Sequence, residues 1–351
     1  MTNASLLDDS PLGSLLSVPP PRLAEAEVAA ALKAHWGLEG TLTPLTSERD
    51  LNFRVETAQG RWVAKIANLA EPPEQTRFQN RALRHLALRD LDLPVPRMLA
   101  TLEGADDLVL PGGHLLRVIS WLDGTPLAMA PRSAAQGRGM AATLARLGLA
   151  LRDFQDPAAD HVLQWDIKNA ARLRAILGDV TDPDLRGLCA SVLDRFDALA
   201  PQFPGWRWQV VHNDLNPHNV LVAPDDPDRL AGIIDFGDMV RTPLVCDLAV
   251  ACSYQVGSED PLARFINFAG AYHAVVPMTA PERAALFDLT ATRMVTTVAI
   301  ASWRAARQPD NAAYILRNFP SARAGLTAFA GLDRDRVAAA LRQACPLECD
   351  Q

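Results

Sequence analysis

The pattern of apolar and polar positions divides the chain near residue 120. Before that point, short runs rich in β-branched and aromatic residues are separated by turn residues, which is typical of strands. Five such runs lie at 42–45, 51–57, 62–67, 98–102 and 115–122. Two other stretches, 24–36 and 74–88, have helical composition or periodicity. This part of the chain therefore predicts a small antiparallel sheet with one main helix among its strands.

After residues 123–124 the chain becomes rich in Ala and Leu with helical periodicity. Helices are predicted at 133–154, 167–177 and 184–199, and they resume after a single β-rich island at 208–235. We therefore expect an α+β chain in three parts. These are a loose leader over 1–22, a β-rich lobe over 23–120 and a mostly helical lobe over 121–351.

Composition excludes several classes of protein. Apolar residues make up 49% and charged residues 21%, as in globular proteins, and the formal net charge of −7 without a basic stripe excludes nucleic acid as a partner. The most apolar stretch, 284–302, is interrupted by Asp288 and Arg293, so no membrane span is expected. Five cysteines without CxxC spacing favour a reduced, cytoplasmic location. The oligomeric state stays open.

The β-rich island carries the chemistry. His212, Asp214 and Asn219 form an HxDxxxxN loop that enters an apolar strand, and a second strand ends in a DFG sequence that begins at Asp235. Phosphoryl transfer needs one carboxylate to orient a hydroxyl nucleophile, and a second carboxylate with an amide oxygen to hold Mg²⁺ against the triphosphate. Asp214 suits the first role, and Asn219 with Asp235 suits the second.

These motifs resemble the aminoglycoside phosphotransferase and choline kinase-like family, the small-molecule relatives of protein kinases, over about residues 35–305. The resemblance implies a protein kinase-like fold with a nucleotide-binding N-lobe and a helical C-lobe that carries the catalytic loop. It also implies ATP or GTP as phosphoryl donor with Mg²⁺. In this family a lysine on the third strand contacts the α- and β-phosphates, and Lys65, the only charge within 62–66, takes that place.

The other nucleotide contacts depart from the protein kinase pattern. No Gly-rich loop and no P-loop occur, so the hairpin at 47–53 would cradle the phosphates with its backbone N–H groups and the Ser47 hydroxyl. Gln79 falls where the family usually has the Glu that positions the lysine, and Glu74 is the other candidate. Trp121 and Leu122 would form the hinge against which adenine packs.

A protein kinase is disfavoured by two features. Asn216 stands where protein Ser/Thr kinases have a lysine, and the segment between Asp235 and Asp247 is too short for an activation segment. Within the family, the sequences at 47–53, 78–80 and 213–219 are most similar to the hydroxylysine kinase branch. The implied reaction is γ-phosphoryl transfer to the hydroxyl of an amino acid or amino alcohol, with homoserine, choline, ethanolamine and aminoglycosides as other acceptors.

Three residues are candidates for contact with the acceptor. Trp165 and Asp166 precede a predicted helix, where Asp166 either caps the helix or binds a substrate ammonium. Arg293 lies on an apolar helix face and must meet a carboxylate, either the substrate's or an internal one such as Asp247, and we expect the internal pair. His212 is expected to orient the catalytic loop.

A nucleotide-binding pseudokinase or regulatory module is the competing hypothesis. Gln79 and the lack of glycines in the phosphate hairpin favour it. The presence of Lys65, Asp214, Asn219 and Asp235 together argues against it, because a module that only binds nucleotide has no use for a base.

Overall fold

The computed structural model describes residues 18, 20–47, 49–256 and 260–347. The chain divides into two compact units, residues 1–123 with 156–158, and residues 124–155 with 159–351. Most of the leader expected over 1–22 lies outside the described residues.

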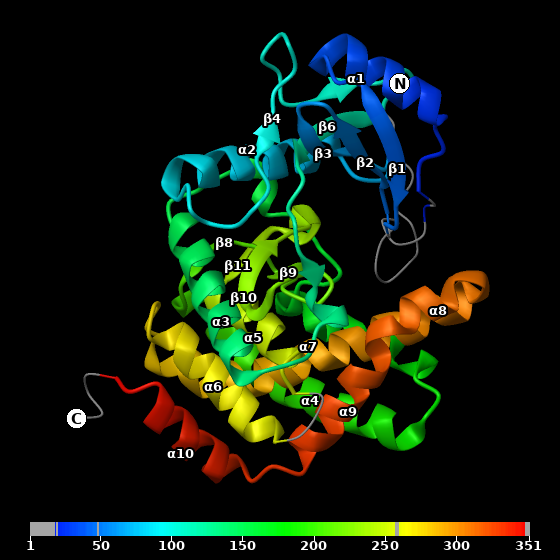
Figure 1. Ribbon diagram of the computed structural model, residues 1–351. Coiled ribbons are helices and arrows are strands. Elements are labelled where there is room, and N and C mark those ends of the chain that lie inside the picture. Colours follow the sequence, from blue (N-terminus) through cyan, green and yellow to red (C-terminus); the bar gives the residue numbers. More distant parts are fainter. Residues whose placement is uncertain (1–17, 19, 48, 257–259, 348–351) are drawn as a thin grey trace. The chain divides into compact units, whose positions relative to one another are not determined.

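The first unit is an antiparallel sheet with two helices (Figure 1). The helices are α1 (Glu25–Trp36) and α2 (Pro73–Arg89). The strands are β1 (Gly40–Leu45), β2 (Leu51–Thr57), β3 (Gly60–Ile66), β4 (Met98–Leu99), β5 (Leu108–Val109) and β6 (Leu115–Ser120), paired in the order β1-β2-β3-β6-β4 with β5 also on β6. The sequence predicted each of these elements except β5, which is only two residues long.

Successive residues of strand β3 lie on opposite faces of this sheet. Ala64 and Ile66 of β3 belong to a buried apolar cluster that includes Leu32 and Trp36 of α1. Because successive side chains in a strand point to opposite faces, Lys65 lies on the other face of the sheet. Its partners in register there are Asn52 of β2 and Arg117 of β6.

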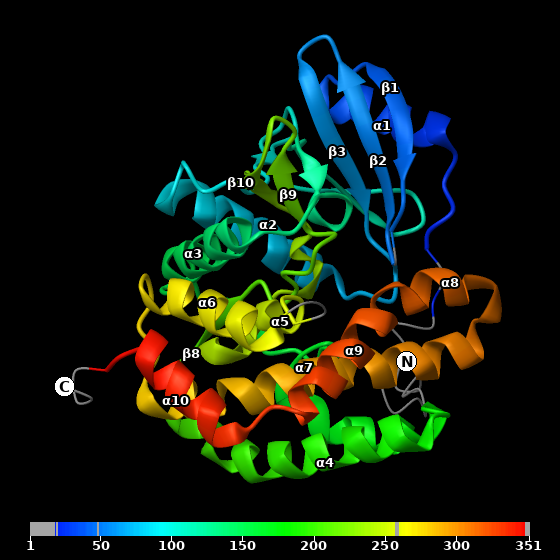
Figure 2. The same ribbon diagram turned by 60° about the horizontal axis from the view of Figure 1, so that its bottom comes forward.

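The second unit is mostly helical (Figure 2). Its α-helices are α3 (Ala134–Ala150), α4 (Pro183–Leu199), α5 (Leu244–Ser253), α6 (Pro261–His273), α7 (Ala280–Arg307), α8 (Ala312–Ile315), α9 (Phe319–Ala330) and α10 (Arg334–Ala344). The helix predicted at 167–177 is instead a 3-10 helix, η4 (Ile167–Asp179), which packs against α4 and α7. Packing against these helices holds the segment in a 3-10 helix, which is wound more tightly than the α-helix that the 3.6-residue periodicity predicts.

Helix α7 forms the centre of this unit. A capping box between Thr279 and Glu282 begins it, and α4, α5, α9 and η4 pack around it. It is the one helix of the described residues that is long and apolar enough to cross a membrane, but 94% of its apolar window is buried inside the protein. That burial is what a core helix requires.

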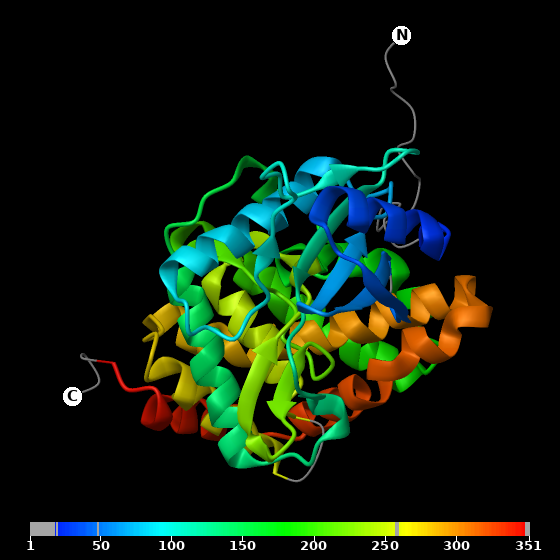
Figure 3. The same cartoon turned by 45° about the horizontal axis from the view of Figure 1, so that its top comes forward.

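The predicted β-rich island is confirmed as three strands, β8 (Trp208–Val211), β9 (Val220–Ala223) and β10 (Asp226–Ile233). Strand β9 pairs with β10 and with β7 (Thr125–Pro126), and β8 pairs with β11 (Val240–Pro243). Figure 3 shows the β9–β10 hairpin beside α3. The loops at the ends of β8, β9 and β10 carry the sequence motifs.

Candidate active site

Backbone hydrogen bonds fix the loop between β8 and β9. Asn216 N–H donates to Asp214 O, and Asn219 N–H donates to Asn216 O (2.8 and 3.0 Å). The Asn219 carbonyl then accepts from Ile234 N–H at 2.9 Å, which ties this loop to the end of β10. Asp235 directly follows Ile234, so the two sequence motifs lie side by side.

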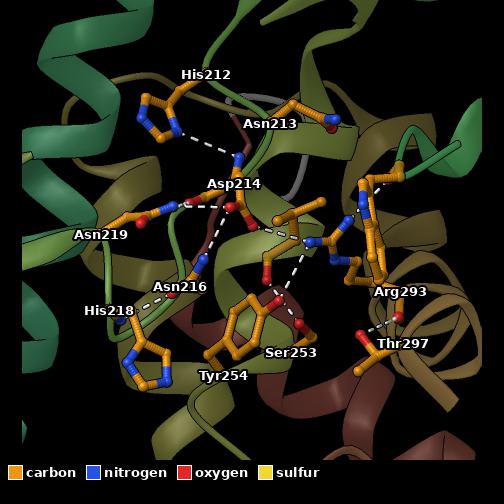
Figure 4. Close-up of polar contacts among 12 residues, drawn as sticks. His212, Asn213, Asp214, Asn216, His218, Asn219, Ser253, Tyr254, Arg293 and Thr297 are labelled. Carbon is orange, nitrogen blue, oxygen red and sulfur yellow. Dashed lines mark hydrogen bonds and ion pairs between the residues drawn. The ribbon is translucent and has the colours of Figure 1, made fainter. Parts of the chain in front are cut away.

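The Asp214 carboxylate is held by three side chains (Figure 4). Its Oδ2 accepts from the amides of Asn216 and Asn219, at 2.8 and 2.7 Å. Its Oδ1 accepts from Arg293 Nη2 at 3.0 Å. The Asp214 side chain is still 19% exposed, so a ligand can reach a carboxylate whose orientation is already set.

Arg293 of α7 approaches Asp214 from the protein interior, and its side chain is 2% exposed. The guanidinium lies against the rings of Trp165 and Tyr254, and it donates to Trp165 O at 2.7 Å and Tyr254 Oη at 3.2 Å. Its partner is thus an internal carboxylate, but Asp214 and not the Asp247 that the sequence suggested. With the side chain 2% exposed and both Nη atoms donating to internal acceptors, the guanidinium is not open to a substrate carboxylate.

Asp247 of α5 has a different partner, which explains that error. Its Oδ1 accepts from Asn213 N–H at 2.7 Å, and Asn213 adopts a left-handed backbone conformation with φ 64°. Few non-glycine residues adopt this conformation, and a buried hydrogen bond to a carboxylate compensates for its strain. Asp247 therefore shapes the backbone that leads into Asp214.

His212 orients the loop, as its contacts show. Its Nδ1 accepts from Asp214 N–H at 3.2 Å, so the proton is on Nε2, which donates to Ile234 O at 3.1 Å. Burial lowers the pKa of His212 to about 4. A neutral ring with both nitrogens engaged has no capacity to accept a substrate proton.

The environment of Asp214 suits a base. Burial raises the pKa of its carboxyl to about 7, and the nearby Asp238 raises it too, whereas Arg293 and the hydrogen bond from Asn216 lower it. A proton acceptor is most effective when its pKa lies near the working pH. Asp238 was not among the residues predicted from the sequence, although it follows the DFG motif directly.

The candidate Mg²⁺ ligands fit the ion by their chemistry. Asn219 directs its amide nitrogen to Asp214, which leaves Oδ1 as its free acceptor. Asp235 is exposed in a left-handed conformation (φ 61°) and accepts from Gly237 N–H at 3.3 Å. In the part of the chain that the structure describes, no cluster of three His, Cys, Asp or Glu residues exists. An amide and a carboxylate oxygen match Mg²⁺, which takes its other ligands from water and phosphates.

In the first unit, the two residues predicted to position Lys65 have polar partners of their own. Gln79 of α2 accepts from Arg117 and donates to Glu71 Oε1 at 3.3 Å. Glu74 pairs with Arg77 at 3.0 Å on the surface of α2. Burial raises the pKa of Glu71. Glu71 was not among the site residues predicted from the sequence. Gln79 thus holds the cation next to Lys65 on the sheet.

The other predicted nucleotide contacts lie at strand ends. Ser47 Oγ accepts from Asp50 N–H at 3.2 Å and so closes the hairpin turn, while Glu48 of that hairpin lies outside the described residues. Trp121 Nε1 donates to Asp123 at 3.1 Å, and Trp121 and Leu122 are partly exposed after β6.

Asp166 caps η4, the first of the two roles considered. Its Oδ1 accepts from Lys168 N–H and from Thr242 Oγ1, and its Oδ2 pairs with Lys168 Nζ. The residue is 1% exposed. We therefore assign Asp166 to structure, while Trp165 serves as a stacking surface for Arg293.

Comparison with known proteins identifies the family of the chain. The chain matches the phosphotransferase enzyme family over residues 41–287. It is 27% identical to the hydroxylysine kinase of Mus musculus over 84% of this chain and 86% of that protein. It is 31% identical to the homoserine kinase of Rhodospirillum rubrum over 67% and 71% of the two chains.

Solved structures show the same fold. An amicoumacin kinase in complex with AMP-PNP, Ca²⁺ and amicoumacin superposes with a TM-score of 0.67 at 15% identity, over 90% of this chain and 97% of that one. A microcompartment-associated aminopropanol kinase superposes with a TM-score of 0.57 at 15% identity, over 92% and 95%. The protein kinase-like fold is confirmed, and the chain belongs to the phosphotransferase enzyme family, whose members here are small-molecule kinases.

Proposed function

We propose that the protein transfers the γ-phosphoryl group of ATP or GTP to the hydroxyl of an amino acid or amino alcohol, with a hydroxylysine-like acceptor. The observation that carries this proposal is the Asp214 carboxylate, which three side chains hold in one orientation while 19% of it stays exposed. That exposure leaves an oriented carboxylate within reach of an incoming hydroxyl. The relatives named hydroxylysine kinase and homoserine kinase support an amino acid acceptor.

Each residue of the site has one task in this reaction. Asp214 accepts a hydrogen bond from the acceptor hydroxyl and takes its proton as the new P–O bond forms. The bond between the γ-phosphorus and the β,γ-bridging oxygen breaks in the same step, and the nucleoside diphosphate leaves. Arg293, Asn216 and Asn219 keep that carboxylate aimed at the hydroxyl. Lys65 is proposed to contact the α- and β-phosphates, and Ser47 with its hairpin the triphosphate. Trp121 and Leu122 are proposed to pack against the nucleotide base.

Asn219 Oδ1 and the Asp235 carboxylate are proposed to hold Mg²⁺. The ion, when bound, neutralises the charge that develops on the β- and γ-phosphate oxygens. The four described cysteines, at 189, 246, 252 and 345, are free and buried. This agrees with the cytoplasmic location that we include in the proposal.

Turnover of a panel of alcohols tests the proposal. The purified protein with Mg·ATP or Mg·GTP is incubated with 5-hydroxylysine, homoserine, threonine, ethanolamine, choline and an aminoglycoside, and nucleoside diphosphate release is measured. We expect release with at least one acceptor. Asp214→Asn should lower kcat about 10²- to 10⁴-fold without changing the Kd for nucleotide. The exposed pair Asp225–Arg229 offers Asp225→Asn as the matched control.

The pseudokinase alternative predicts a different result. A regulatory module would bind nucleotide with no acceptor-dependent release, and Asp214→Asn would then change nothing that the assay measures. A protein kinase would phosphorylate a peptide and none of the small alcohols.

A further inference from the structure

A polar segment next to the catalytic loop has no part in the chemistry proposed above. The turn η8 (Leu316–Asn318) follows α8, and the Asn318 side chain hydrogen-bonds the His218 ring. The Arg317 guanidinium is close enough to act electrostatically on the same ring. His218 N–H donates to Asn216 Oδ1 at 2.8 Å, and the amide of Asn216 donates to Asp214. Two residues therefore connect η8 with the carboxylate that receives the acceptor.

Arg317 is held in place although it is exposed. Its guanidinium lies 3.8 Å from the centroid of the Tyr314 ring, and Nη1 donates to Tyr314 O at 3.0 Å. No carboxylate of the described residues pairs with it. The Nε and Nη2 edge of the planar group is thus open, and this edge can bind a carboxylate with two parallel hydrogen bonds. Prior stacking reduces the side-chain entropy lost on binding.

Three other cations of this unit are already occupied. Arg293 is buried behind Asp214, as described above. Lys168 pairs with Asp166 and donates to Arg241 O at 2.6 Å. Arg241 lies over the Trp208 ring and pairs with Asp160 at 3.5 Å.

The charge around the site makes such a cation necessary for one class of acceptor. Asp214 and Asp238 lie together, and Asp235 acts electrostatically on Asp214 as well. This acidic surrounding attracts an ammonium group but repels a carboxylate. An amino alcohol therefore needs no further partner, whereas an amino acid needs a cation for its carboxylate.

We propose that Arg317, with Asn318 and His218 beside it, is the subsite for the carboxylate of the acceptor. The enzyme then selects hydroxyl-bearing amino acids over amino alcohols and aminoglycosides. This inference rests on the proposed function and names the substrate class of the same site.

Matched pairs of alcohols that differ only in the carboxylate test this subsite. Homoserine is compared with 3-amino-1-propanol, and 5-hydroxylysine with 1,5-diaminopentan-2-ol, in the full chain with Mg·ATP or Mg·GTP. For at least one pair, we expect kcat/KM to be about tenfold or more higher for the amino acid, the usual worth of hydrogen bonds to a charged group. Arg317→Gln should raise the KM for the amino acid about tenfold, with kcat and the amino alcohol's KM unchanged. Arg317→Lys should have an intermediate effect, because it keeps the charge but loses the planar fork.

Arg323→Gln is the matched control on α9, where Arg323 pairs with Asp182 on the surface at 2.6 Å. It removes the same charge and should leave both KM values unchanged. Equal turnover of both members of each pair, or an equal effect of Arg317→Gln on both, would overturn the subsite while the proposed kinase function stands. Failure to phosphorylate any alcohol would overturn the proposed function and the subsite with it.

Discussion

The contact between Arg293 and Asp214 allows a quantitative prediction from a double-mutant cycle. Arg293→Met fills a similar volume but removes the guanidinium, and it leaves the Asp214 carboxylate facing a buried position without its cation. Removing one partner of a buried ion pair costs about 3–5 kcal/mol. Because Asp214 is 19% exposed and keeps its bonds from Asn216 and Asn219, we expect the lower end, about 3 kcal/mol.

The second and third proteins of the cycle are Asp214→Asn and the double variant. An asparagine at 214 can still accept from Arg293 Nη2 but brings no charge. The guanidinium keeps its bonds to Trp165 O and Tyr254 Oη but loses its countercharge, so this cost should also be about 3 kcal/mol. In the double variant neither charge is left alone. We therefore expect the double variant to lose about 2 kcal/mol less stability than the sum of the two single costs, which is within the range found for residues in contact.

Urea unfolding followed by tryptophan fluorescence measures this coupling. Trp165 is a suitable reporter because its ring centroid lies 5.4 Å from the Arg293 guanidinium. The same proteins are assayed for turnover. Arg293→Met should lower kcat about 10²-fold, because the Asp214 carboxylate is no longer held in one orientation, and should leave the nucleotide Kd unchanged. Additivity within about 0.5 kcal/mol, or a normal kcat in Arg293→Met, would show that the asparagines alone position Asp214.

Three further predictions concern the metal, the nucleotide and the pH dependence. Asp235→Ala should abolish turnover because it removes a proposed Mg²⁺ ligand, and a near-normal kcat with intact folding would refute the metal site. Lys65→Ala should chiefly raise the KM for nucleotide, and Lys65→Arg should restore it only in part, since an ammonium and a guanidinium place their donors differently; three equal KM values would remove Lys65 from the site. Burial raises the pKa of Asp247 to about 7, above its unfolded value, so the folded state binds the proton more tightly and the free energy of unfolding falls as pH rises from about 4 to about 7. Asp247→Asn cannot titrate and so lacks this loss. Measured by urea unfolding, the free energy of unfolding of the variant minus that of the parent should therefore be larger at pH 8 than at pH 5, by up to about 3 kcal/mol. An equal difference at both pH values would contradict the reasoning.

The elements that carry the site could be predicted because their local signals are strong. Strand β2 was predicted at its observed bounds, and the island of β8 to β10 stood out against helical surroundings. The spacing of the HxDxxxxN and DFG motifs specifies a loop and a strand end, and both are short-range features of the chain. Helix η4 was less predictable because its winding depends on packing between α4 and α7.

The partners of buried charges could not be predicted in the same way. Apolar periodicity showed that Arg293 faces the interior, but it gave no means to choose between Asp214 and Asp247. The choice depends on the left-handed conformation of Asn213, whose N–H needs Asp247. Gln79 presents the same difficulty, because its partner Arg117 is 38 residues away in sequence and meets it only when β6 pairs with β3.

Asp214 and Asp247 illustrate how partners, and not pKa values, separate catalytic from structural carboxylates. Burial raises the pKa of both to about 7. Asp247 accepts a backbone N–H and is 2% exposed, so its hydrogen bond stabilises the fold. Asp214 is bound by side chains and keeps an exposed edge, so an incoming hydroxyl can add a hydrogen bond without displacing the loop. A perturbed pKa marks both residues as unusual, and the exposed edge identifies the one that can meet a substrate.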